Sequence, residues 1–352
     1  METKLIEISS PAGHEDALRE AGEILRAGGL VVMPTETVYG LGGDATSPDA
    51  AKAIYEAKGR PSDNPLIIHI AEPEEAERYA VTCDAYYRLA RHFMPGPLTV
   101  ILPKKDIIPA SVTGGLDSVA VRCPSHPVAR ALIRTAGVAI AAPSANRSGR
   151  PSPTCAKHVV EDLWGRVDMI IDSGDCELGL ESTIVKLEGD RGVLLRPGAV
   201  TPDDLRAVLK ELTVAPAVTA ALAEGERVLS PGMKYRHYAP AAPLILLEGE
   251  EDDVSAFLCQ KATERGVGIL CFDEEVAQMP AAARLFPIGA KSDLSTQAHR
   301  LFAALRDADG DATLTQLYAH LPPKEGLGLA LYNRAIRAAA HQIMKVNKQR
   351  KG

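Results

Sequence analysis

Short apolar segments of strand length alternate with segments of helical periodicity along most of the chain. Over residues 15–28 the apolar side chains recur at helical spacing, and the apolar run at residues 30–33 has the length of a strand. After residue 243 the alternation becomes regular, with strands expected at residues 244–247, 267–272, 284–288 and 314–321 and helices at residues 252–265, 292–306 and 327–345. Such alternation is typical of α/β domains, in which helices cover a sheet.

Between residues 49 and 212 the same alternation continues less regularly. Helices are expected at residues 49–57, 85–93 and 127–136 and after Thr201, and strands at residues 66–70, 98–102, 118–122, 138–142, 169–171, 183–187 and 193–196. The length of 352 residues suits about two domains. We predict a large α/β domain over residues 1–212, a connector over residues 213–241 and a small doubly wound parallel sheet over residues 242–352.

The charge balance limits the partners that the protein can have. Lys and Arg total 39 against 46 Asp and Glu, a net charge of -7, so no basic excess favours non-specific nucleic-acid or membrane binding. The N-terminal residues lack the apolar run of a signal peptide, and no stretch approaches the roughly 18 apolar residues of a membrane span. We therefore expect a cytoplasmic protein with no membrane partner, whose anion sites are local.

Residues 34–44, PTETVYGLGGD, leave a predicted strand with two hydroxyls and a carboxylate close together. Ligands often bind where strands end in α/β sheets. Residues 40–45 fit the loose pattern G-x-G-x-x-A, but they begin about seven residues after the strand, which argues against a dinucleotide site. A glycine-rich turn that caps a helix and a ligand-binding loop remain equal alternatives here.

Residues 58–65, KGRPSDNP, place two cations and two short polar side chains around a glycine and two prolines. A stiff, positively charged loop of this kind suits a phosphate or a carboxylate. The alternative is a helix end at which Lys58 and Arg60 only stabilise the helix dipole.

Residues 142–154, APSANRSGRPSPT, follow an apolar strand and precede a helix that we expect Thr154 to cap. Thirteen residues with many hydrogen-bond donors are long for a plain connection, which favours a binding role. Arg122 ends another apolar strand, where an arginine is usually paired or reaches a ligand. Ser182 and Arg196 lie at the two sides of a predicted hairpin.

These segments share anion recognition by Arg, Lys, Ser, Thr and Asn, without a Walker A loop, a nucleophile paired with a base, or a cluster of metal ligands. Such a site positions phosphates, because phosphoryl transfer depends mainly on alignment and charge stabilisation.

Together the motifs resemble the threonylcarbamoyl-AMP synthase family in its long two-domain form. The segments that carry the resemblance are PTETVYGLG, KGRP, PSANRSGRPSPT, ESTIV, LRPGA and SPGMKYRHYAP, in that order between residues 34 and 240. The resemblance implies a YrdC-like twisted mixed sheet with helices in the N-terminal domain and a smaller Rossmann-like domain at the C-terminus.

The resemblance also implies an activity: condensation of L-threonine, bicarbonate and ATP into threonylcarbamoyl-AMP and pyrophosphate, by nucleotidyl transfer, for modification of the tRNA adenosine beside the anticodon. Catalysis would fall to Lys58, Arg60 and Arg122. Threonine would be held by Thr35, His69, Arg122, Ala142 and Ser182. The nucleotide would be held by Lys58, Arg60, Asn64, Ser118, Ser144, Asn146, Ser152, Arg196, Tyr235 and His237. Mg²⁺ would arrive with ATP rather than on protein side chains.

The connector carries Tyr235 and His237 among several cationic and aromatic side chains that could close over a nucleotide and exclude water, so we predict a lid; the alternative is a plain linker. By the resemblance, a tRNA threonylcarbamoyl transferase complex would receive the product. An RNA contact of the chain itself stays open. Two other functions remain as alternatives: a non-catalytic double-stranded RNA-binding module and another enzyme that forms a carbamoyl-adenylate. The first would need a basic face with aromatic side chains, whereas aromatic residues make up only 4% of the chain.

Overall fold

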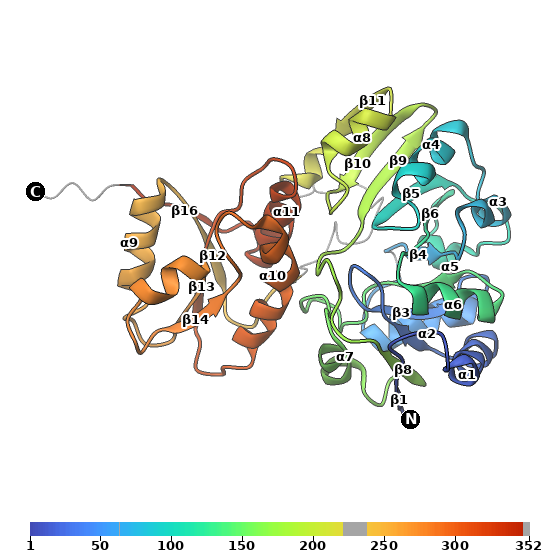
Figure 1. Cartoon of the computed structure of the whole chain (residues 1–352), viewed down its shortest axis with the longest axis horizontal. Coiled ribbons are helices and arrows are strands. Elements are labelled where there is room, and N and C mark those ends of the chain that lie inside the picture. Colours follow the sequence, from blue (N-terminus) through green and yellow to red (C-terminus); the bar gives the residue numbers. More distant parts are fainter. Residues whose placement is uncertain (63, 221–237, 348–352) are drawn as a thin grey trace, which may run out of the picture. The chain divides into compact units, whose positions relative to one another are not determined.

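The chain divides into two compact units. The computed structural model describes residues 1–62, 64–220 and 238–347. The N-terminal unit holds most of residues 1–218, and the C-terminal unit holds most of the chain from residue 235 onward (Figure 1). Each unit is built around its own sheet.

The sheet of the N-terminal unit has eleven described strands with mixed directions. Their order is β1-β8-β2-β3-β7-β4-β6-β5-β9-β10-β11. The strands are β1 Lys4–Glu7, β2 Val31–Met33, β3 Gly40–Asp44, β4 Ile67–His69, β5 Leu98–Pro103, β6 Ser118–Arg122, β7 Ile140–Ala141, β8 Met169–Asp172, β9 Thr183–Glu188, β10 Arg191–Arg196 and β11 Glu211–Val214. The sheet contains parallel pairs such as β4 with β6 and antiparallel pairs such as β5 with β6, so the predicted mixed sheet is confirmed.

Local sequence signals fix several helices of this unit. The helices are α1 Glu15–Arg26, α2 Pro48–Lys58, α3 Ala76–Tyr79, α4 Asp84–Phe93, α5 Ala110–Thr113, α6 Pro127–Ala136, α7 Ala156–Leu163 and α8 Pro202–Val208. In α2 the Ser47 side chain accepts from the Ala50 amide, and the helix ends at Gly59 in the left-handed conformation. Leu25 of α1 and Leu132 of α6 share a buried cluster with Ile140 of the sheet.

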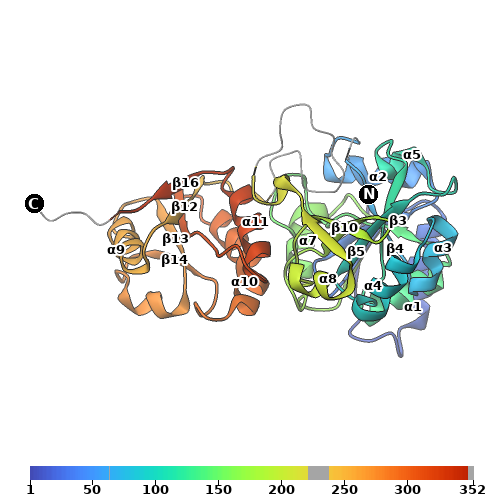
Figure 2. The same ribbon diagram turned by 90° about the horizontal axis from the view of Figure 1, so that it is seen from above.

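The C-terminal unit contains a five-stranded sheet in which all described pairs are parallel, in the order β14-β13-β15-β12-β16. Its strands are β12 Leu244–Glu248, β13 Val267–Cys271, β14 Arg284–Pro287, β15 Gln316–His320 and β16 Ile343–Lys345, and its helices are α9 Glu251–Lys261, α10 Leu294–Asp309 and α11 Gly328–Ala338. Helix α9 lies on one side of the sheet and helices α10 and α11 on the other (Figures 1 and 2). The predicted doubly wound parallel sheet is therefore confirmed.

Three local predictions were wrong. Residues 40–44 form strand β3 rather than a turn. The helix expected over residues 327–345 ends at Ala338, because Ala340 and His341 adopt positive φ angles of 47° and 62°, and residues 343–345 then form strand β16. Helix α7 begins at Ala156 with Cys155 at its N-cap, so Thr154 does not cap it.

Within the described residues, no helix combines the length and the apolar character that crossing a membrane requires.

One glycine of β3, Gly42, is required by close neighbours on the sheet. A Cβ on Gly42 would lie 2.7 Å from Ile140 Cγ2 and 2.9 Å from the carbonyl oxygen of Val31. The second of these atoms belongs to the backbone and cannot rotate away. Strand β3 can therefore fit between β2 and β7 only because this position has no side chain.

We expect Gly42→Ala to lower the free energy of unfolding by about 1–3 kcal/mol, since the strand must shift to relieve the overlap. The matched control is Gly43→Ala, whose Cβ would meet Ile54 Cδ1 at 3.1 Å and Ala50 Cβ at 3.3 Å, both side-chain atoms. Urea unfolding of the two variants measures the difference. Equal losses in both would show that backbone contact at Gly42 does not constrain the strand.

Candidate functional site

A row of directly paired residues crosses six neighbouring strands of the large sheet. From β7 to β10 the row runs through Ile140, His69, Arg122, Thr99, Ile184 and Arg196. Directly paired residues point to the same side of a sheet, so the first five side chains share one face, which we call the site face. The register shifts between Leu194 and Arg196, and Arg196 reaches the same face through Ser182, whose Oγ contacts both Arg196 Nη2 and Thr99 Oγ1. Three of the predicted site residues, His69, Arg122 and Arg196, lie in this row.

A second row on the site face is apolar. Ile67, two residues before His69, pairs with Ala120, and Ala120 pairs with Ile101. These three belong to one buried hydrophobic cluster with Ile184. The predicted residue Ala142 donates its amide to the Ile67 carbonyl at 2.9 Å and lies two residues beyond Ile140, so it continues this row. The site face thus carries two neighbouring rows. We call the first the polar row, because His69, Arg122, Thr99 and Arg196 lie in it, and the second, apolar row the floor.

Arg122 is held by a buried ion pair with Glu36. Arg122 Nη2 donates to Glu36 Oε1 at 2.7 Å, and the side chains are 5% and 4% exposed. The other carboxylate oxygen, Glu36 Oε2, accepts from the Ser125 amide at 3.2 Å. Arg122 Nε is buried and has no hydrogen-bond partner among the described residues. A buried charged donor in this condition is costly and points to an acceptor supplied by a ligand.

His69, beside Arg122, is held in its neutral form. Burial and the nearby Arg122 guanidinium lower the pKa of His69 to about 3. Its Nδ1 lies 3.2 Å from the Ile67 carbonyl oxygen. A neutral imidazole with so low a pKa can position a substrate, but it is a poor acceptor for the proton of an ammonium group.

Ser182 connects Thr99 with Arg196 at the β10 end of the row. Its Oγ lies 2.7 Å from Thr99 Oγ1 and accepts from Arg196 Nη2 at 3.0 Å. Arg196 Nε donates to the Ser182 carbonyl at 2.9 Å. Arg196 and Ser182 therefore fix each other, as the hairpin of β9 and β10 brings both sides of the motif together.

Lys58 fixes the long loop over residues 142–154. Its ammonium donates to the carbonyl oxygens of Ser144 and Asn146, the latter at 2.6 Å. Ser144 Oγ donates to Asn146 Oδ1 at 2.5 Å, and the Ser148 amide donates to the Lys58 carbonyl at 2.9 Å. Lys58, Ser144 and Asn146, expected near the nucleotide, are thus adjacent.

Asn64 and Ser118 lie away from Arg122. Asn64 precedes β4 and Ser118 begins β6, so they sit at the amino ends of two parallel strands whose carboxyl ends hold His69 and Arg122. Arg122 lies four positions after Ser118, about 13 Å along the strand. Asn64 is 0% exposed, and its side-chain amide oxygen and nitrogen have no hydrogen-bond partner among the described residues.

The remaining predicted residues have mixed positions. Thr35 Oγ1 donates to the Val38 carbonyl at 2.6 Å and thus shapes the loop after β2. Ser152 Oγ donates to Glu181 Oε1. The hydroxyl that was expected to contact the nucleotide therefore has a carboxylate partner within the protein. Arg60 is buried just after the end of α2.

The last two predicted residues, Tyr235 and His237, lie outside the described residues, and so does the part of the predicted lid that carries them.

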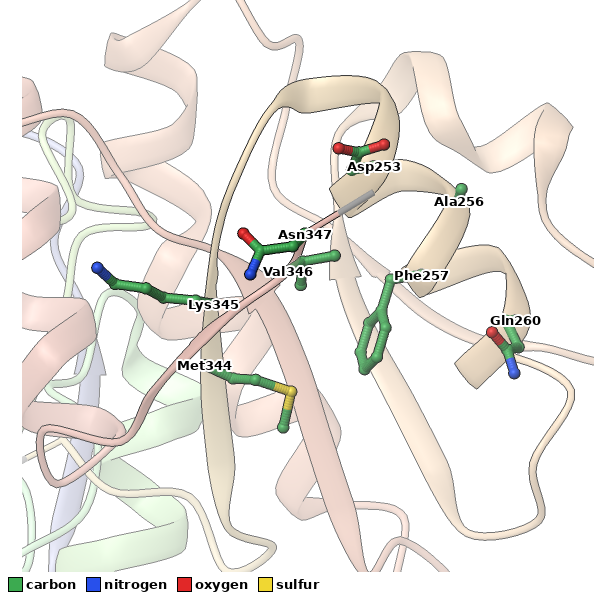
Figure 3. A pocket seen from close by; sticks show the side chains of 8 residues that line it. All are labelled: Asp253, Ala256, Phe257, Gln260, Met344, Lys345, Val346 and Asn347. Carbon is green, nitrogen blue, oxygen red and sulfur yellow. The ribbon is translucent and has the colours of Figure 1, made fainter. Parts of the chain in front are cut away.

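Besides a cavity of about 750 Å³ beside Gly266 and Arg284 in the C-terminal unit, two further cavities lined by described residues lie outside the polar row. One, of about 630 Å³, is lined by residues of α2 together with Arg60, Ser62 and Ser111. The other, of about 370 Å³, lies in the C-terminal unit between α9 and the segment that contains β16, where Phe257 faces it (Figure 3). The second holds none of the predicted site residues. Among the described residues, no group of three or more His, Cys, Asp or Glu side chains could hold a metal ion.

Sequence reasoning assigned no role to Glu36, Thr99 or Glu181. The motif at residues 34–44 did show a carboxylate, but its partner Arg122 is 86 residues away along the chain. Thr99 lies within a strand of otherwise apolar residues and carries no motif. Only strand pairing brings it beside Arg122 and within reach of Ser182.

Comparison with known proteins finds similarity along the whole chain. The family model described as telomere recombination matches residues 23–198, and the model described as threonylcarbamoyl-AMP synthase, C-terminal domain, matches residues 200–340. The threonylcarbamoyl-AMP synthase of Bacillus subtilis is 43% identical over 336 residues, which cover 94% of this chain and 95% of that protein.

Two further matches come from Pyrococcus abyssi. Its threonylcarbamoyl-AMP synthase is 44% identical over 335 residues, which cover 94% of this chain and 96% of that protein. A crystal structure of a protein from the same organism complexed with L-threonine is similar at a TM-score of 0.88 and 40% identity, covering 99% of this chain and 100% of that chain.

The low pKa of His69 predicts a pH dependence of stability. Because the folded-state pKa of about 3 lies below the ordinary value of 6.5, the unfolded chain takes up the proton first as the pH falls. The contribution of His69 is complete above pH 6.5 and is lost between pH 6.5 and 3. From pH 7 to 5 the wild type should lose about 2 kcal/mol of unfolding free energy through this group.

His69→Gln should remove that loss, so its unfolding free energy should fall by about 2 kcal/mol less over the same interval. Urea unfolding at pH 7 and pH 5 measures it. The control is His92→Gln, which replaces an exposed imidazole on α4 and should retain the wild-type dependence. A His69→Gln profile parallel to the wild type would contradict a neutral His69.

Proposed function

The chain belongs to the threonylcarbamoyl-AMP synthase family and makes threonylcarbamoyl-AMP, and we propose that it does so by transferring the AMP moiety of ATP to a carbamate of L-threonine. The observation that carries this proposal is the full-length similarity to a protein solved with L-threonine. The product serves tRNA modification. This function is favoured over the alternative of a non-catalytic RNA-binding module.

Threonine fits the Arg122 end of the site face. Arg122 Nε supplies a buried donor for a carboxylate, and an arginine can grip such a group with two parallel hydrogen bonds. The neutral His69 leaves Arg122 as the cation at this end of the polar row. Ala142, Ser182 and Thr35 are the other residues that we propose to contact threonine. The small side chain of Ala142 leaves room for the substrate above the floor, and the hydroxyls of Ser182 and Thr35 can form hydrogen bonds with it.

The nucleotide fits the other cationic residues of the predicted site. Lys58, Arg60 and Arg196 provide positive charge for phosphates, and Ser144, Asn146 and Ser152 lie in the loop that Lys58 anchors. Asn64 and Ser118 would hold the more distant part of the nucleotide. We expect Mg²⁺ to enter with the triphosphate as part of the substrate.

The proposed chemistry needs little acid or base catalysis from side chains. The neutral amine of threonine and bicarbonate give a carbamate and water, which balances without another proton acceptor. A carbamate oxygen then bonds to the α-phosphorus of ATP while the bond from that phosphorus to the β-phosphate bridging oxygen breaks, releasing pyrophosphate. Lys58, Arg60 and Arg122 contribute alignment and positive charge, as such transfers require.

A downstream partner and a location follow from the proposed activity. A tRNA threonylcarbamoyl transferase complex would consume the mixed anhydride, which water would otherwise hydrolyse. Such a relay places the protein in the cytoplasm, with no role for a membrane.

Purified protein supplied with ATP, Mg²⁺, L-threonine and bicarbonate should release pyrophosphate, and omission of any one of the four should reduce release to background. Mass spectrometry should find threonylcarbamoyl-AMP among the nucleotides. Release that is indifferent to threonine would contradict the proposed reaction, and salt-dependent RNA binding without turnover would instead favour the alternative function.

Asn64 offers a test of the nucleotide site. Asn64→Leu, which replaces a buried amide that has no partner among the described residues by an apolar group of similar size, should raise the free energy of unfolding by about 1–2 kcal/mol. The same change should raise the KM for ATP at least tenfold, since the amide can no longer bind nucleotide. The KM for threonine is the internal control and should change less than threefold. A less stable variant with an unchanged KM for ATP would contradict this role.

A further inference from the structure

We propose that Glu36 is a positioning residue for threonine: it holds one edge of the Arg122 guanidinium so that the remaining N–H groups face the substrate carboxylate. This inference rests on the proposed function and adds a residue that neither the motifs nor the proposed mechanism assigned. Glu36 itself touches Arg122 and would act through it.

Glu36 fixes Arg122 from outside its own strand. Arg122 ends β6, whereas Glu36 lies in the connection between β2 and β3, which are separated from β6 by β7 and β4. The carboxylate is itself held at both oxygens, one by Arg122 and the other by the Ser125 amide, and the Glu36 carbonyl accepts from the Leu178 amide at 2.8 Å. With backbone and side chain both anchored, Glu36 is a fixed support rather than a mobile counter-ion.

The direction of the guanidinium follows from this contact. Glu36 occupies an N–H of Nη2, while the Nε–H stays buried without a partner among the described residues. The guanidinium is planar, so fixing Nη2 strongly limits rotation of the whole group and sets where Nε points. An acceptor at Nε would complete the charged donor set, and a carboxylate matches the fork geometry of arginine.

Stability alone does not account for the pair. Removing two charges from water costs several kcal/mol each, and a well-packed apolar pair often serves folding as well or better. The retained pair does supply something that apolar side chains cannot, which is an arginine already oriented before the substrate arrives. A preorganised donor does not have to reorganise on binding, which saves part of the entropy cost of recognition.

The test is a double-mutant cycle on the full chain. We expect Glu36→Ala to weaken binding of L-threonine at least tenfold in calorimetry and to raise the KM for threonine similarly, while the KM for ATP changes less than threefold. In an Arg122→Lys background, which keeps the charge but removes the fork, Glu36→Ala should change the KM for threonine less than twofold. Non-additivity of this kind marks a residue that acts through Arg122.

Glu36→Gln is the second variant, because it retains an acceptor and the side-chain volume where Glu36→Ala could unfold the chain. It should fold as judged by circular dichroism and weaken threonine binding by about threefold. The matched control is Glu72→Ala, which breaks ion pairs with Arg130 and Arg134 elsewhere in the same unit and should leave threonine binding unchanged.

The inference would be overturned by wild-type threonine affinity in both Glu36 variants, by equal losses of threonine and ATP affinity, or by the same loss in the Arg122→Lys background. Failure of the proposed function is separable from these outcomes. In that case the wild-type protein itself would bind no threonine.

Discussion

Strand register is the constraint on which the site depends. Six strands spread over residues 67–196 contribute one residue each to a single row, and three of the six residues carry a cation or an imidazole. A shift of one residue in β6 would turn Arg122 to the opposite face, because side chains alternate along a strand. The apolar second row, which includes Ile67, Ala120 and Ile101, resists such a shift, since these side chains would lose their buried cluster. Packing of the floor therefore positions the polar row.

The cations of the site are fixed before any substrate binds. Lys58 donates to loop carbonyls, Arg196 donates to the backbone and hydroxyl of Ser182, and Arg122 is paired with Glu36. These partners differ in charge, and the difference matters. Carbonyl and hydroxyl groups orient Lys58 and Arg196, whereas the Glu36 carboxylate both orients Arg122 and offsets its charge. Preorganised charge of this kind stabilises a transition state without reorganisation during the reaction.

The sequence allowed prediction of elements whose pattern is local. Arg122 could be singled out because it ends an otherwise apolar strand, and α8 because the Thr201 motif forms a capping box within four residues.

Strand β3 could not be predicted from the sequence, because three glycines in five residues disfavour a strand. Such a strand forms only where neighbouring strands need the space that a glycine leaves, as at Gly42. The end of α11 was also hidden, because helical periodicity continues past a turn that two residues of positive φ create. Glu36 belongs with these cases: the sequence places a carboxylate in the motif, but only the fold shows which cation it meets.

Charge is distributed over the site in a way that can separate the two substrates. In the polar row, burial keeps His69 neutral and Glu36 offsets Arg122, so this end carries little net charge. A zwitterion such as threonine suits an end of this kind, since its carboxylate needs a directed donor more than a strong field. A triphosphate carries several negative charges, and on the proposed assignment it is drawn to the cations Lys58, Arg60 and Arg196. If His69 were protonated, a second cation beside Arg122 would attract phosphate to the threonine end. On the proposed assignment, the neutral imidazole therefore contributes to specificity by excluding charge, while Arg122 and Glu36 supply geometry.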